Sequence, residues 1–95
     1  MYKIIFTKPF IRKSSRITKN NKELQEKIKN GLEDLSKDPF LPSLKTHKAN
    51  TKEHGKRYSS TVTGDLRIIW DYGEKELTIF ALDLGGHSGK NKVYK

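Results

Sequence analysis

The fold is decided by the stretch from Thr63 to Leu84, which reads TGDLRIIWDYGEKELTIFALDL. From Leu66 to Tyr72 the side chains alternate as in a strand with one buried face, and the apolar run from Leu77 to Leu84 predicts a second strand. Gly64-Asp65 and Tyr72-Gly73-Glu74-Lys75 have the composition of turns. We therefore expect two neighbouring antiparallel strands here.

Further strands are predicted on both sides of this stretch. Arg57 to Thr63 alternates enough to form a strand, which makes a three-stranded meander with the two that follow. Met1 to Thr7 predicts a short N-terminal strand, and a final short strand is expected around Val93. Pro39 to Gly55 has two prolines and many lysines, so we expect a surface connection that contains a turn or short strand.

Two helices are predicted between the N-terminal strand and this connection. Pro9 suits the first turn of a basic helix that ends near Thr18. Asn20-Asn21-Lys22-Glu23 resembles a helix cap with an acid three residues on, and Asp38-Pro39 stops the second helix. Its apolar residues recur at helical spacing: Leu24, Ile28, Leu32 and Leu35.

This order of elements predicts an α+β domain that spans residues 1–95. We expect two N-terminal helices packed on one face of a small, mainly antiparallel sheet of four to five strands. Only 33% of the residues are hydrophobic, so the core must be thin and the other sheet face should stay available to a ligand.

The composition also bears on the compartment. The chain has no cysteine, which excludes disulfides and thiolate zinc sites and fits a reducing cytoplasm. The apolar run from Met1 to Phe6 is too short for a signal peptide or a membrane span. We expect a cytoplasmic protein without a membrane partner.

The net charge of +9 predicts attraction to polyanions or to an acidic protein. The basic excess recurs in three segments. Residues 8–29 hold eight basic and two acidic side chains, residues 43–58 hold five and one, and the residues after Asp83 hold three and none. Plain solvation of the surface is the alternative interpretation.

Arg67 is the first candidate for chemistry. Alternation along its strand places one set of side chains towards the helices and the other set on the opposite face: Leu66, Ile68, Trp70 and Tyr72, against Arg67, Ile69 and Asp71. A guanidinium there could bind a phosphate through two hydrogen bonds and stabilise the added negative charge of a pentacovalent transition state. The alternatives are an ion pair with Asp71 or Asp65, or a solvated arginine.

The histidines and a late tyrosine are further candidates. His87 follows Gly85-Gly86 at the end of a strand, and imidazole transfers protons near neutral pH. His47, in a loop between lysines, could approach the same phosphate, whereas we expect His54 to be solvated. Tyr94 could stack on a base or orient a phosphate, and the alternative is an aromatic residue that closes the sheet edge. The spacing of the three histidines gives little support for a metal site.

These features resemble the RelE/ParE superfamily of bacterial toxins. Gly64-Asp65-Leu66-Arg67 matches the Gly-x-x-Arg pattern of RelE-like strands, whose arginine binds phosphate. Gly85-Gly86-His87 matches the late Gly-x-His, and His47, Asp65 and His87 fall where YafQ-like members have catalytic residues. A late aromatic residue is also shared, with Tyr94 as its candidate. The resemblance thus implies a catalytic set whose members are His87, Arg67, Asp65, His47 and Tyr94.

Two departures distinguish this chain from RelE itself. RelE uses lysines on the preceding strand, where this chain has Tyr58-Ser59-Ser60-Thr61-Val62, so the lysine-rich mechanism is not expected. The spacing from His87 to Tyr94 exceeds that of many relatives. Other basic residues are therefore expected to bind RNA or its phosphates: Lys45, Lys48, Lys56, Arg57, Lys90 and Lys92.

The resemblance implies the toxin of a type II toxin-antitoxin pair. It would be a ribosome-dependent, metal-free endoribonuclease without a cofactor, which helps the RNA 2′-hydroxyl attack the adjacent phosphate. Its partners would be the ribosome, mRNA and an acidic antitoxin protein, with the oligomeric state left open. The alternatives are a ParE-like, non-enzymatic toxin that binds DNA gyrase, a small basic RNA-binding protein, and an inactive relative.

Overall fold

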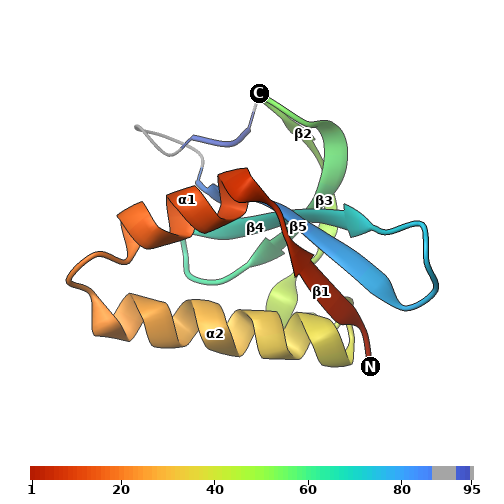
Figure 1. Cartoon of the computed structure of the whole chain (residues 1–95), viewed down its shortest axis with the longest axis horizontal. Helices are drawn as coiled ribbons and strands as arrows, with labels where there is room; N and C mark the ends of the chain where they lie inside the picture. Colours follow the sequence, from red (N-terminus) through yellow and green to blue (C-terminus); the bar gives the residue numbers. More distant parts are fainter. Residues whose placement is uncertain (87–91, 95) are drawn as a thin grey trace.

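The computed structural model describes residues 1–86 and 92–94 and contains, within them, a five-stranded sheet covered on one face by two helices (Figure 1). The elements are β1 (Lys3–Phe6), α1 (Lys8–Ile17), α2 (Lys22–Lys37), the 3₁₀ turn η1 (Pro42–Leu44), β2 (His47–Thr51), β3 (Gly55–Thr61), β4 (Arg67–Tyr72) and β5 (Thr78–Gly85). The predicted α+β class and mainly antiparallel sheet are confirmed.

The strand order is β1-β5-β4-β3-β2. The predicted meander of β3, β4 and β5 is antiparallel, and β2 extends it as one edge strand. β1 forms the other edge and runs parallel to β5, with Lys3 opposite Thr78 and Phe6 opposite Ala81. The connection expected between Pro39 and Gly55 thus contains an edge strand, whose one apolar residue, Ala49, explains its weak signal in the sequence.

Helix α2 begins and ends where its sequence predicts. Asn21 is the N-cap, and its side chain accepts a hydrogen bond from the Leu24 amide at 3.0 Å. Asp38 is the C-cap, directly before Pro39, which cannot extend the helix. The buried face of α2, with Ile28 and Leu35, packs on the sheet.

Helix α1 is fastened to the middle of β5. Its N-cap, Thr7, donates its hydroxyl to the carbonyl oxygens of Ala81 at 2.8 Å and Leu82 at 3.1 Å. This contact marks the point at which β1 stops pairing with β5, and α1 then runs beside the second half of that strand. No helix in residues 1–86 or 92–94 is long and apolar enough to cross a membrane.

The main core lies between the helices and the sheet, as the alternation in β4 predicts. Ile68 and Trp70 are fully buried there. Trp70 stacks on Tyr58 with ring centroids 4.6 Å apart and donates its indole N–H to Ser60 Oγ at 2.8 Å. Tyr72 continues this face but lies beyond the helices and is exposed, where partial burial and then the neighbouring Tyr2 raise the pKa of its hydroxyl.

Candidate functional site

Arg67 begins β4 on the face opposite the helices, directly across from Gly85 of β5. Its Nη1 donates to the carbonyl oxygens of Thr63 at 2.7 Å and Leu66 at 3.3 Å. These bonds turn the guanidinium towards the loop between β3 and β4. Its Nε and Nη2 groups have no hydrogen-bond partner among the described residues, so these donors are left for a ligand.

Asp65 lies in the loop before Arg67 and packs against the backbone of Gly86. A Cβ atom added to Gly86 would come within 2.5 Å of the Asp65 carbonyl oxygen and 2.9 Å of both carboxylate oxygens. The loop is held by the Thr63 hydroxyl, which accepts from the Leu66 amide at 3.0 Å. Only a glycine at position 86 allows this approach, which brings the Asp65 carboxylate beside the residue that precedes His87.

Gly86→Ala is expected to displace the Asp65 loop, because the added methyl group has no room. Gly64→Ala is the matched control: it lies in the same loop, and an added Cβ there meets nothing within 4 Å. We expect the first variant to lower the free energy of unfolding, measured by urea titration, by about 1 to 3 kcal/mol. The second variant should change this free energy by less than about 1 kcal/mol. Equal stability of the two variants would contradict the close packing at Gly86.

His87 and Lys90, two of the predicted site residues, lie outside the described residues. Their described neighbours are Gly86 and Lys92, which form an isolated parallel bridge, with the Val93 amide donating to the Gly86 carbonyl at 2.9 Å. Lys92 is exposed. Three residues therefore lie near the C-terminal end of β5: Arg67 across from Gly85, Asp65 packed on Gly86, and Lys92 bridged to Gly86.

Residues 92–94 lie across the sheet face that the sequence predicts to be open. The Lys52 amide donates to the Val93 carbonyl at 2.8 Å, and Tyr94 bridges to Thr51. Val93 and Tyr94 bury Ile69 in a second small core. The prediction of an uncovered face is therefore wrong around Ile69, because this apolar side chain of β4 points away from the helices and is buried by other residues.

Tyr94 is itself buried, and its hydroxyl hydrogen-bonds to Ser59 Oγ on β3. This packing is that of an aromatic residue that closes the sheet, which is the structural alternative raised by the sequence. A catalytic role for Tyr94 stays a prediction.

His47 is the first residue of β2 and not a loop residue. It pairs with Ser59, which in turn pairs with Ile69, so it belongs to the same sheet face as Arg67. It lies two strands from β4, roughly 10 Å at the usual strand spacing. Its ring Nδ1 is 3.0 Å from the Lys45 carbonyl oxygen, and the side chain is exposed.

The other basic candidates are dispersed. Lys48 belongs to the opposite face, where its ammonium lies 4.3 Å from the Tyr58 ring centroid. Lys45 and Lys56 are exposed. Arg57 is paired with Asp71 at 2.8 Å, so the ion pair proposed as an alternative for Arg67 is made by Arg57. Arg67 forms no ion pair with a carboxylate in the described part of the chain.

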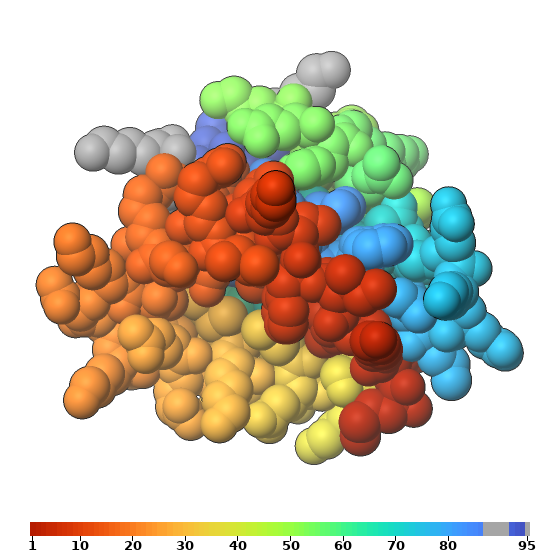
Figure 2. Space-filling view, viewed as in Figure 1, coloured from red at the N-terminus to blue at the C-terminus, as the bar shows by residue number. Residues whose placement is uncertain are grey.

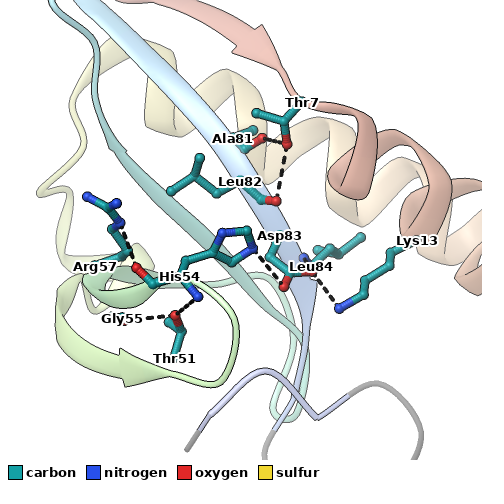
Figure 3. Close-up of polar contacts among 10 residues, drawn as sticks. All are labelled: Thr7, Lys13, Thr51, His54, Gly55, Arg57, Ala81, Leu82, Asp83 and Leu84. Atoms are coloured by element: carbon teal, nitrogen blue, oxygen red, sulfur yellow. Dashed lines mark hydrogen bonds and ion pairs between the residues drawn. The ribbon is translucent and has the colours of Figure 1, made fainter.

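The sequence interpretation missed a polar cluster around Asp83 (Figure 3). His54, expected to be solvated, is partly buried, and its Nε2 lies 3.2 Å from Asp83 Oδ2. The ammonium of Lys13, from α1, lies 2.7 Å from Oδ1 of the same carboxylate. The prediction for His54 is wrong because the tip of the β2–β3 hairpin folds over the sheet, which no local spacing indicates.

No family model and no curated protein matches this sequence significantly. Solved structures do match its fold. A metal-bound toxin from Helicobacter pylori has a TM-score of 0.71 at 24% identity, covering 92% of this chain and 96% of that one. A chain of the archaeal RelE–RelB complex from Pyrococcus horikoshii OT3 has a TM-score of 0.70 at 17% identity, covering 92% of this chain and 96% of that one. YafQ from E. coli has a TM-score of 0.61 at 18% identity, covering 90% of this chain and 93% of that one.

Proposed function

We propose that this chain, which has the fold of the RelE/ParE toxin superfamily, is the toxin of a type II toxin-antitoxin pair and cleaves mRNA on the ribosome. The observation that carries the proposal is the convergence at the end of β5. Arg67 faces Gly85 with unused donors, and the Asp65 carboxylate packs on Gly86, immediately before His87. A carboxylate and an imidazole can transfer the protons, and a cation can offset the phosphate charge, in a metal-free phosphodiester cleavage.

In this mechanism the RNA 2′-hydroxyl attacks the adjacent phosphate. Asp65 or His47 takes the proton from the attacking hydroxyl, and His87 gives a proton to the departing 5′-oxygen. The guanidinium of Arg67, aided by Lys90 or Lys92, offsets the charge on the phosphate oxygens as the transition state forms. The products would carry a 2′,3′-cyclic or 3′ phosphate and a 5′-hydroxyl.

The antitoxin would be an acidic protein that covers the basic face and folds on contact. The basic surface includes exposed residues of α1, such as Arg12, and of the β2–β3 hairpin, such as Lys52 and Lys56. Both elements appear on the same side of the molecule in Figure 2. A RelE-like relative has been solved as a complex with RelB, which agrees with a partner of this kind.

Mapping RNA ends on translating ribosomes tests the proposal. Purified ribosomes carrying a defined mRNA are incubated with the protein and with EDTA-treated protein, and new 5′ ends are located by primer extension and tested for a free hydroxyl. We expect new 5′-hydroxyl ends in both reactions. If the mRNA stays intact and the protein inhibits DNA gyrase in a separate supercoiling assay, the ParE-like alternative is supported. If the mRNA stays intact and the protein only binds RNA, the simple RNA-binding protein is supported.

Arg67→Ala is expected to lower single-turnover cleavage by about 10²-fold or more, because the transition state loses its charge partner. Folding should be preserved, since the side chain is only partly buried and lies outside the main core. Arg12→Ala is the matched control because it removes the same charge from the exposed surface of α1. Cleavage by Arg67→Ala at the rate of this control would remove Arg67 from the site.

A further inference from the structure

Two side chains of metal-binding type, His54 and Asp83, meet where the tip of the β2–β3 hairpin folds over β5 (Figure 3), and the carboxylate of Glu53 lies near them. One ligand atom each from Glu53, His54 and Asp83 lies within 4.8 Å of the other two. Glu53 and His54 come from the hairpin tip, whereas Asp83 is in β5, so tertiary folding alone creates the group. We propose that these residues bind a divalent transition-metal ion, with Zn²⁺ as the test ion.

The separation of the two better-fixed ligands fits a shared ion. His54 Nε2 and Asp83 Oδ2 are 3.2 Å apart. Two ligand atoms that each lie about 2.1 Å from one zinc ion are about 3.0 to 3.4 Å apart for octahedral to tetrahedral angles. The ion can therefore take the place of the direct contact between the imidazole and the carboxylate, with little movement of either group.

The fold holds these two ligands in place and leaves a route from solvent. Only 2% of the Asp83 side chain and 19% of the His54 side chain are exposed. The backbone of His54 is fixed by its amide, which donates to Thr51 Oγ1 at 3.0 Å, and by its carbonyl, which accepts from Arg57 Nε at 3.0 Å. Glu53 is exposed, so its flexible carboxylate can close on the ion from the outside.

Lys13 is the group that opposes the ion. Its ammonium lies 2.7 Å from Asp83 Oδ1, on the other oxygen of the shared carboxylate. The two carboxylates contribute two negative charges and Lys13 offsets one of them. Removing the charge of Lys13 should therefore strengthen binding, whereas removing a ligand should weaken it.

The donor set selects the class of ion. One imidazole nitrogen and two carboxylate oxygens suit Zn²⁺ or Ni²⁺, while Mg²⁺ and Ca²⁺ prefer oxygen ligands alone. The bound ion would clamp the hairpin tip to β5. Because it acts on the hairpin and not on the RNA phosphate, this inference stands apart from the proposed cleavage.

Calorimetric titration of the whole chain with Zn²⁺ tests the site, using His54→Gln and Glu53→Gln as ligand variants and His47→Gln as the matched control. We expect one ion per chain, affinity lowered about 10²-fold in His54→Gln and about tenfold in Glu53→Gln, and no change in His47→Gln. Lys13→Met should raise the affinity roughly tenfold. Mg²⁺ should give no heat at the same concentrations.

Amide NMR spectra with substoichiometric Co²⁺ locate the ion without reference to activity. Signals of residues 52–55 and 83 should broaden first. Broadening centred on residue 47 or 87, or an affinity lost in His47→Gln and kept in His54→Gln, would overturn the assignment, as would the absence of Zn²⁺ binding. If His54→Gln does not fold, the exposed substitution Glu53→Gln and the Co²⁺ experiment still decide the question.

Discussion

Replacing His87 by Gln is expected to slow single-turnover cleavage by about 10² to 10⁴-fold, because glutamine cannot give or take a proton near neutral pH. Glutamine keeps much of the size and polarity of the side chain. Binding to ribosomes should therefore be retained, and the loss should fall on the chemical step.

The measurement is the cleavage rate with the variant in excess over programmed ribosomes, together with its affinity for them. His54→Gln is a useful comparison, because it removes an imidazole that the proposed mechanism does not use. Cleavage by His87→Gln at the normal rate would exclude proton transfer by this residue, and a loss explained by weaker ribosome binding would show a binding role instead.

Trp70→Ala should lower the free energy of unfolding by about 3 to 5 kcal/mol, as expected for a large side chain deleted from a core. Trp70 is fully buried, stacks on Tyr58 and bonds to Ser60. Urea unfolding followed by circular dichroism measures the loss. Phe40→Ala provides the control, because Phe40 also contacts Trp70 but is 53% exposed, so its truncation should cost much less. A loss below about 1 kcal/mol for Trp70→Ala would contradict this packing.

Local patterns in the sequence predict the centre of this fold well. Alternation in β4 assigns Ile68 and Trp70 to the helical side, and the Asn21 cap with Asp38-Pro39 sets the limits of α2. The RelE-like resemblance is confirmed at the level of the fold. In each case the information lies within one element or its immediate neighbours.

Contacts between distant segments are harder to predict. The cluster of Lys13, His54 and Asp83 joins residues 29 or more positions apart, which no spacing rule connects. The cover over Ile69 had one visible signal: an isoleucine on the same strand face as Arg67 needs apolar neighbours. The site around Arg67 could be predicted only in part. Gly-x-x-Arg is a local motif, but the approach of Asp65 to Gly86 depends on the pairing of β4 with β5.

The pairing of β1 with β5 also sets when the fold can be completed during synthesis. The first strand of the chain pairs with residues 78–81, and the core under α1 and α2 needs Trp70, Ile79 and Leu84. The contact between β1 and β5 joins two ends of a long stretch of chain, so it cannot form before β5 is available. The growing polypeptide therefore cannot complete its sheet or the core beneath the helices until β5 has been translated and has left the ribosome. Under the function proposed above, the chain would therefore be unable to act on the ribosome that makes it until β5 has emerged.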